Sequence, residues 1–426
     1  MIPANSRFIN LLKQILHPRE NDSSRRGKTL LIVVSDDRFF MSHRLDIGRA
    51  AVKSGWRVIV AAGENGCRDA ILSEGMEYEA LPDPTQGAGP FAALRSLNIL
   101  SGLLRRNPDC ILHLVGVKMM MLGNMAAGFV GHKGAIVNAV SGLGISFQKT
   151  DSIKARTLAG VLRLLWPRKK VHTTIFQNRE DEQLLRHYGV LTNDEDIEFI
   201  KGSGVDLSNF GHSQSLRTLS DGRLRVIFSG RMLRSKGVTD LIEAAEMLRR
   251  KWGRRAQFLL CGATHHNPDS LTADELSRLC DGKYIRWAGH CSNMPQLLAS
   301  SRIMAFPSYY REGLPKSLIE ASAVGLPIIT CDSVGCRDTI DGNGVLVEPR
   351  NPRQLAEEID RLLGNEELCE EMGRRSRALA ERDYDLKEVI RCHMEIYNRL
   401  HAALESHQSV KSVMADQSLQ CASMSV

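Results

Sequence analysis

The sequence predicts an α/β protein with two Rossmann-like, doubly wound domains that face each other across a cleft. Three observations predict this fold. The chain has 426 residues, too many for one hydrophobic core. Short apolar runs alternate with stretches of helical periodicity, as in parallel sheets covered by helices. A polar stretch over residues 190–223 interrupts this pattern, which then begins again.

The first domain is predicted over residues 28–200, after an N-terminal extension over 1–27. "KTLLIVVSDD" is a continuous apolar run ending in acids, typical of a strand buried on both faces. A helical segment, "SHRLDIGRAAVKSG", ends at Gly55. Four further apolar runs predict strands, which right-handed crossovers would join into one parallel sheet: "WRVIVAAG", "CILHLVG", "GAIVNAV" and "HTTIFQN".

The second domain is predicted over residues 201–384. Its apolar runs predict four strands, "RLRVIFSG", "AQFLLCG", "YIRWAG" and "RIMAFPS", with helices at "VTDLIEAAEMLRR" and "MPQLLASS". A C-terminal helix over 385–404 is expected to return to the first domain, and the Ser-rich tail over 405–426 to be disordered. Because ligands of open α/β sheets bind beyond the carboxyl ends of strands, two facing sheets predict a ligand cleft.

Composition narrows the class of protein. The chain is 43% hydrophobic and 25% charged, as in globular proteins, and its net charge of +7 suits a phosphate ligand or an acidic membrane. We expect no nucleic-acid partner. Ten cysteines without a CxxC pair indicate reduced thiols and a cytoplasmic location, and no secretory signal is visible. The apolar window "LVGVKMMMLGNMAAGFVG" is interrupted by Lys118 and Asn124, which favours buried core over a membrane span.

Two bases follow a predicted strand in "IFSGRMLRSKGVTDLIEAA". Arg231 and Lys236 flank a loop that begins at Gly230 and leads into a helix, whose free N–H groups and dipole favour an anion. A guanidinium holds two phosphate oxygens at once, and an ammonium acts as a point charge. Taken alone, the loop is equally well explained as a solvated basic turn. It lacks the Walker lysine pattern and the GxGxxG spacing.

Two carboxylates frame a turn and a helix start in "YREGLPKSLIEASAVGLPIIT". Gly313 allows a ligand close to the backbone, and the amides of Lys316 and Ser317 are expected to point to the cleft. Glu320 can accept both hydroxyls of a ribose, and Glu312 can accept hydroxyls of a second sugar. The plain alternative is a set of solvated helix charges, but helix-dipole carboxylates would gather in the first turn.

These residues carry a family resemblance. "GRMLRSKG" and "YYREGLPKSLIEASAVGLPIITCDSVGCRDTIDGNGVLVEP" resemble the nucleotide-sugar half of the retaining glycosyltransferases of family 4, which have the GT-B fold and a Glu-x7-Glu signature. "FFMSHRLDIGRAAVKSGWRVIVAA" and "IVNAVSGLGISF" resemble the acceptor half of members that build bacterial surface polysaccharide. The likeness extends over residues 28–400.

The resemblance assigns roles. Arg231 and Lys236 would hold the donor pyrophosphate, Glu320 the ribose and Glu312 the transferred sugar, so that Glu312, Lys236 and Arg231 are the catalytic candidates. The implied donor-binding set is Gly230, Arg231, Lys236, Gly313, Leu314, Lys316, Ser317 and Glu320. No metal and no cofactor are implied, and the nucleoside-diphosphate sugar is a co-substrate.

The acceptor side departs from the family pattern. Where many relatives have a histidine facing the sugar, this chain has Ser141 in "NAVSGLG". His43 and His113 are the other candidates near strand ends, each more often structural than functional. A general base is not essential, because in a front-face retaining transfer the departing phosphate oxygen can take the acceptor proton.

A basic stretch, "SIKARTLAGVLRLLWPRKKVHTTIFQNR", predicts contact with an anionic membrane. Trp166 would be its aromatic anchor beside "PRKK", and "RFINLLKQIL" near the N-terminus would add contact. An ordinary surface helix explains the stretch equally well. The expected location is therefore cytoplasmic, or peripheral on the inner face of the cytoplasmic membrane.

The function predicted from the sequence is transfer of a hexosyl or N-acetylhexosaminyl unit to a lipid-linked or growing glycan in polysaccharide biosynthesis. Two alternatives stay open. One is a catalytically silent nucleotide-sugar-binding subunit of an assembly complex, which Ser141 favours. The other is a nucleotide-sugar epimerase of the same fold, against which the Glu-x7-Glu signature argues.

Overall fold

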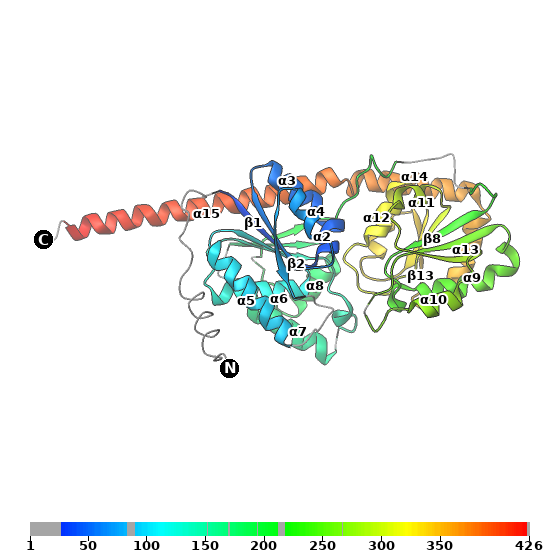
Figure 1. Cartoon of the computed structure of the whole chain (residues 1–426), viewed down its shortest axis with the longest axis horizontal. Helices are drawn as coiled ribbons and strands as arrows, with labels where there is room; N and C mark the ends of the chain where they lie inside the picture. Colours follow the sequence, from blue (N-terminus) through cyan, green and yellow to red (C-terminus); the bar gives the residue numbers. More distant parts are fainter. Residues whose placement is uncertain are drawn as a thin grey trace, which may run out of the picture.

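The computed structural model has two α/β domains side by side, with the last helix of the chain running back along the first (Figure 1). It describes residues 27–82, 90–150, 152–168, 171–193, 195–211, 218–265 and 267–423. The N-terminal extension, apart from Gly27, lies outside the described residues. Among the described helices, none has the length and hydropathy needed to cross a membrane.

The first domain is built on a seven-stranded parallel sheet in the order β3-β2-β1-β4-β5-β6-β7. Its strands are β1 (Thr29–Asp36), β2 (Arg57–Gly63), β3 (Glu77–Leu81), β4 (Ile111–Val115), β5 (Ile136–Val140), β6 (His172–Phe176) and β7 (Ile197–Phe199). The strand order reverses between β1 and β4, which places a topological switch point at their carboxyl ends.

Helices cover both faces of this sheet. Leu30 and Ile32 of β1 face one core, shared with α2 (Asp37–His43), α3 (Leu45–Lys53), α4 (Arg68–Ser73) and α15 (Leu386–Ser423). Leu31 and Val33 face the other core, shared with α5 (Pro90–Arg106), α6 (Val117–Phe129), α7 (Ile153–Leu165) and α8 (Arg179–His187). The continuous apolar run in β1 follows from burial on both faces.

The second domain has a six-stranded parallel sheet in the order β10-β9-β8-β11-β12-β13. The strands are β8 (Leu224–Ser229), β9 (Ala256–Cys261), β10 (Ile285–Gly289), β11 (Ile303–Phe306), β12 (Ile328–Cys331) and β13 (Gly344–Val347). The helices are α9 (Val238–Trp252), α10 (Ala273–Leu279), α11 (Met294–Ala299), α12 (Lys316–Ala323), α13 (Pro352–Leu363) and α14 (Glu366–Asp383). Its switch point lies between β8 and β11.

The predicted fold class of two doubly wound domains is confirmed. Four strands escaped the sequence analysis, namely β3, β7, β12 and β13. β3 and β7 are edge strands in which glutamates stand between other residues. Both strands are only partly buried, so they lack the apolar run of the central strands. β7 also has only three residues and lies inside the polar stretch that we interpreted as a linker.

The chain crosses between the domains twice, and the two crossings touch. The Val205 amide donates to the Tyr384 carbonyl at 2.9 Å, and the Leu386 amide donates to the Val205 carbonyl at 3.1 Å. Gly204 has φ 73°, and a Cβ there would lie 2.8 Å from the Leu386 Cα, so this close approach requires glycine. The outgoing and returning segments therefore form one paired connection.

Helix α15 packs on the first domain through Val389, Ile396, Tyr397 and Leu400. The helix continues to Ser423, whereas we expected a disordered tail from residue 405. Helix-favouring residues outweighed the Ser-rich composition, since residues 386–423 contain neither glycine nor proline.

Candidate functional site

The candidate site lies at the switch point of the second domain. Strands β8 and β11 are parallel neighbours, so their carboxyl ends meet at one edge of the sheet and bring together the loops 230–237 and 307–315. Gly237 has φ 76°, and a Cβ there would lie 2.1 Å from the Pro307 carbonyl oxygen, so the loops are in direct contact. Gly230 directly follows β8, and its amide donates to the Cys261 carbonyl at 2.9 Å.

Lys236 and Glu312, one from each loop, form an ion pair. Lys236 is 8% exposed and ends the short turn Arg234–Lys236, and its Nζ lies 5.2 Å from the Phe306 ring centroid. Ser308 Oγ donates to Glu312 Oε1 at 3.3 Å. A cation and a carboxylate that are 76 residues apart thus meet in a nearly buried position.

Arg231 lies in the same loop but is exposed, and its guanidinium forms no hydrogen bond or ion pair with the part of the chain that the structure describes. Its backbone carbonyl accepts from the Leu233 amide at 2.7 Å. The side chain is therefore available to a ligand that reaches the edge of the site.

Helix α12 begins with Lys316 and Ser317, and Pro315 at its N-cap supplies no side-chain cap. The first-turn amides consequently offer an anion site. Glu320 lies one turn further, with its Oε1 3.8 Å from Lys316 Nζ. Burial raises the pKa of Glu320 above its ordinary value, and the charge of Lys316 acts in the opposite direction.

The first domain presses Ser141 and its neighbour Gly142 against the Glu312–Gly313 segment. A Cβ on Gly142 would lie 2.4 Å from the Gly313 nitrogen, and one on Gly313 would lie 2.6 Å from the Ser141 carbonyl carbon. A larger residue in place of either glycine would therefore push the two domains apart at this contact. Ser141 lies beside the predicted sugar site.

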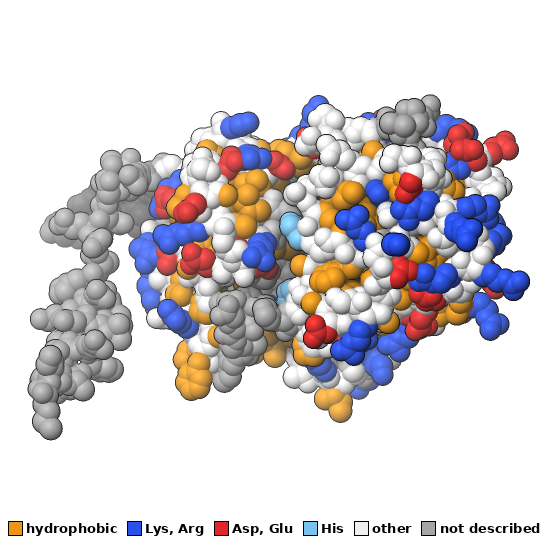
Figure 2. All heavy atoms as spheres, turned by 45° about the vertical axis from the view of Figure 1, so that its right-hand side comes forward, with side chains coloured by type: hydrophobic (Ala, Val, Ile, Leu, Met, Phe, Trp, Pro, Cys, Tyr) orange, Lys and Arg blue, Asp and Glu red, His pale blue; other side chains and the backbone are white. Residues whose placement is uncertain are grey.

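His43 ends helix α2 at the domain interface. Its ring stacks on Phe39 with centroids 4.3 Å apart, and its Nδ1 is 2.6 Å from Ser42 Oγ. Burial lowers its pKa well below the ordinary value, and the positive charges of Lys316 and Lys236 from the other domain act in the same direction. Figure 2 shows histidine side chains in the groove between the two domains.

His113 is not part of this groove, which corrects our expectation that it lies on the acceptor side. It is 0% exposed in β4, and its Nδ1 is 2.6 Å from the Tyr397 hydroxyl of α15. The returning helix covers the strand at this point, so no surface of His113 is left for a sugar.

The basic stretch also differs from expectation at Trp166, which is 5% exposed and whose Nε1 donates to Glu195 Oε2 at 3.2 Å. It is a core residue and no membrane anchor. In α7 the side chains of Ile153 and Leu164 are exposed instead, by 85% and 83%. Residues 169 and 170 lie outside the described residues.

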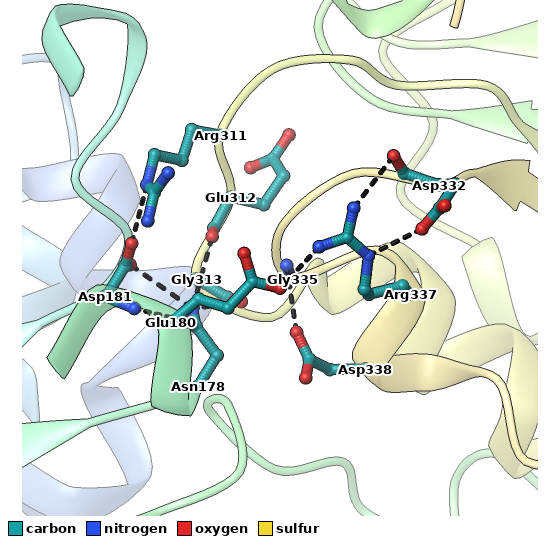
Figure 3. A network of polar contacts seen from close by, with 10 residues as sticks. All are labelled: Asn178, Glu180, Asp181, Arg311, Glu312, Gly313, Asp332, Gly335, Arg337 and Asp338. Carbon is teal, nitrogen blue, oxygen red and sulfur yellow. Dashed lines mark hydrogen bonds and ion pairs between the residues drawn. The ribbon is translucent and has the colours of Figure 1, made fainter. Parts of the chain in front are cut away.

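The sequence analysis missed a set of polar residues of the first domain that bind the Glu312 loop (Figure 3). Asp181 forms an ion pair with Arg311, Asn178 donates to the Gly313 carbonyl at 3.2 Å, and the Leu314 amide donates to Gln177 Oε1 at 2.8 Å. The only signal in the sequence was the group "QNRED", which begins at the end of the predicted strand "HTTIFQN", at the sheet edge where ligands bind.

Comparison with known proteins shows which families and relatives the chain is similar to. Residues 216–379 match the family described as glycosyl transferases group 1. The chain is 28% identical to the N,N'-diacetylbacillosaminyl-diphospho-undecaprenol alpha-1,3-N-acetylgalactosaminyltransferase of Campylobacter jejuni, over 73% of this chain and 82% of that protein. It is 25% identical to the capsular polysaccharide biosynthesis glycosyltransferase CapM of Staphylococcus aureus, over 44% of this chain and 48% of CapM.

Solved structures share the whole two-domain architecture. Anabaena Alr3699/HepE, solved in complex with UDP, aligns with a TM-score of 0.68 and 17% identity over 87% of this chain and 100% of that chain. Sucrose-phosphate synthase from Thermosynechococcus elongatus aligns with a TM-score of 0.69 and 17% identity, over 88% of this chain and 100% of that chain. These likenesses establish the fold. The chain accordingly has the GT-B arrangement of two Rossmann-like domains, and its residues 216–379 are similar to the glycosyl transferases group 1 family.

Proposed function

We propose that this protein is a retaining glycosyltransferase. It would move a hexosyl or N-acetylhexosaminyl unit from a nucleoside-diphosphate sugar to a lipid-linked or growing glycan in polysaccharide biosynthesis. The main support is the nearly buried pair of Lys236 and Glu312 at the switch point, enclosed by Ser141 and Gly142 of the other domain. The names of the two glycosyltransferase relatives agree with such a role.

Each group has a part in donor binding. Glu320 would accept hydrogen bonds from the ribose hydroxyls, and Glu312 those from the transferred sugar. Lys236, Arg231 and the first-turn amides of α12 would neutralise the diphosphate, which needs no metal ion. In the free protein Lys236 is paired with Glu312, and the donor would bring it a second anionic partner.

The transfer step needs little proton chemistry from the protein. The anomeric C–O bond to the diphosphate breaks, and the acceptor hydroxyl oxygen forms a new bond to that carbon on the same face. The proton of the hydroxyl passes to the departing diphosphate oxygen, so charge stabilisation and orientation are the contributions of the site. His43 would act as a neutral hydrogen-bonding group, because its pKa is lowered.

A membrane-bound acceptor would suit one face of the first domain, that of helices α5, α6 and α7. Residues 90–179 contain thirteen Lys or Arg and two acids, whereas the whole chain has a net charge of +7. Five large apolar side chains are strongly exposed on these helices: Phe91, Leu94, Phe129, Ile153 and Leu164. Phe91, Leu94 and Phe129 also line a groove of about 610 Å³. Exposed apolar groups among bases favour an anionic bilayer.

The test combines binding and turnover. A panel of nucleoside-diphosphate sugars is ranked by thermal shift, because a ligand stabilises only the state that binds it. The best donor is then incubated with native membranes, and release of nucleoside diphosphate is measured together with the configuration of the product linkage.

Release that depends on membranes, with retained configuration, supports the proposal. Binding without any release would indicate the silent subunit. Conversion of the donor sugar to its epimer without diphosphate release would indicate an epimerase.

A further inference from the structure

We propose that Asp181, together with Asn178 and Gln177, positions the catalytic Glu312 loop through Arg311, so that the first domain controls the geometry of the donor sugar site. This inference rests on the proposed transfer. It assigns a role to first-domain residues that contact the backbone and side chains of this loop. Asp181 belongs to α8 of the first domain, and Arg311 directly precedes Glu312 in the second.

The central contact is an ion pair buried between the domains. Arg311 Nε donates to Asp181 Oδ1 at 2.7 Å, and the two residues are 8% and 0% exposed. Asn178 Nδ2 lies 3.2 Å from Asp181 Oδ2, which gives the second carboxylate oxygen a partner as well. Removing one partner of a buried pair is more disruptive than removing one partner of an exposed surface pair.

The same segment also holds the backbone that follows. Asn178 Nδ2 donates to the carbonyls of Glu312 and Gly313 at 3.5 and 3.2 Å, and Gln177 Oε1 accepts from the Leu314 amide at 2.8 Å. Gln177 and Asn178 of the first domain thus form hydrogen bonds with three consecutive loop residues, 312–314. In Figure 3 the Arg311 side chain points to Asp181, whereas the Glu312 carboxylate points away from it.

The loop is enclosed on its other side by the segment that follows β12. The Glu312 amide donates to the Val334 carbonyl at 3.3 Å, and a Cβ on Gly335 would lie 2.3 Å from the Gly313 carbonyl oxygen. This segment is itself tied to the first domain, because Arg337 forms an ion pair with Glu180. The Glu312 loop therefore lies between the start of α8 on one side and the segment after β12 on the other, and that segment is itself bound to α8.

These contacts determine the direction of the Glu312 side chain. Peptide planes are rigid, so fixing the side chain of Arg311 and the carbonyl of Glu312 leaves the Cα–Cβ bond of Glu312 little freedom. Its carboxylate then meets Lys236 in one arrangement. Loss of Asp181 would release the loop and leave the donor contacts of Glu320 in place, so turnover should fall more than donor binding.

The first test does not depend on activity. In Asp181→Asn, hydrogen exchange of the amides over 309–314 should become about tenfold faster than in the wild type, because local opening is easier. The matched control is Glu182→Gln, which removes a pair with Arg186 on the same helix and should leave that loop unchanged. Unchanged exchange in Asp181→Asn would overturn the inference.

The second test is kinetic. Asp181→Asn should lower kcat by about tenfold or more with the donor KM within about twofold, and in a Glu312→Gln background it should cause no further loss. A purely structural role predicts that the two losses multiply, and that result would also overturn the inference. If the wild type turns over no donor, the proposed transfer fails, and the exchange measurement still decides whether α8 holds the loop.

Discussion

Replacing Lys236 by methionine tests the central pair of the site most directly. The substitution keeps most of the length of the side chain and removes its charge. This leaves the Glu312 carboxylate, whose side chain is 14% exposed, without its cation. Removing one partner of a buried ion pair typically costs about 3–5 kcal/mol. We expect the lower end, about 3 kcal/mol, because the Ser308 hydroxyl still donates to Glu312.

The cost to turnover should be larger than the cost to donor binding. Loss of a preorganised charge that faces developing negative charge lowers kcat by about 10²–10³-fold. For a domain of this size, about 3 kcal/mol corresponds to a fall in Tm of roughly 6–12 °C. Both effects are read from one preparation, by thermal unfolding without donor and by release of nucleoside diphosphate.

The double variant Lys236→Met/Glu312→Gln separates stability from catalysis. It removes both charges, so stability should recover most of its loss while activity stays low. If Lys236→Met alone lowers the free energy of unfolding by less than about 1 kcal/mol, the pair behaves like an exposed ion pair. A double variant less stable than Lys236→Met would refute the reasoning in the same way.

Three further outcomes are expected. Glu320→Ala should weaken donor binding by about 1–3 kcal/mol in a calorimetric titration, and an unchanged affinity would exclude the ribose role. His113 and His393 are buried with lowered pKa values, that of His393 to about 3, so the unfolded chain binds more protons below pH 6.5. Stability should therefore fall with decreasing pH by about 1.4 kcal/mol per unit for each histidine, and His393→Gln should flatten the slope measured by urea unfolding. Phe91→Ser/Phe129→Ser should reduce sedimentation with anionic vesicles while donor binding is kept, and equal sedimentation would leave the groove without a membrane role.

The meeting of the two loops that carry Lys236 and Glu312 could be predicted well because its signals are local. The loops of Lys236 and Glu312 each follow a buried strand, and parallel neighbours place their carboxyl ends at one edge. Short-range patterns of glycine, proline and helix starts therefore sufficed to identify both loops. That the two side chains form an ion pair followed from no pattern, since it depends on strand order.

Burial in the first domain was predicted less well, because it depends on distant segments. Histidine and tryptophan often occur in binding sites. In this protein, however, α15 covers His113 and Glu195 binds Trp166. Their partners lie 284 and 29 residues away along the chain. Asp181 and Arg311, 130 residues apart, were missed for the same reason.

The sequence by itself determined the two α/β domains, most of the central strands and the two loops that carry Lys236 and Glu312. These follow from apolar periodicity and turn chemistry, which act over a few residues. Only the tertiary structure decided which charges meet, that α15 seals His113 away, and that α8 of one domain holds the Glu312 loop of the other. Such contacts arise from the packing of one domain on the other, and no local pattern in the chain encodes the partner of a buried polar group.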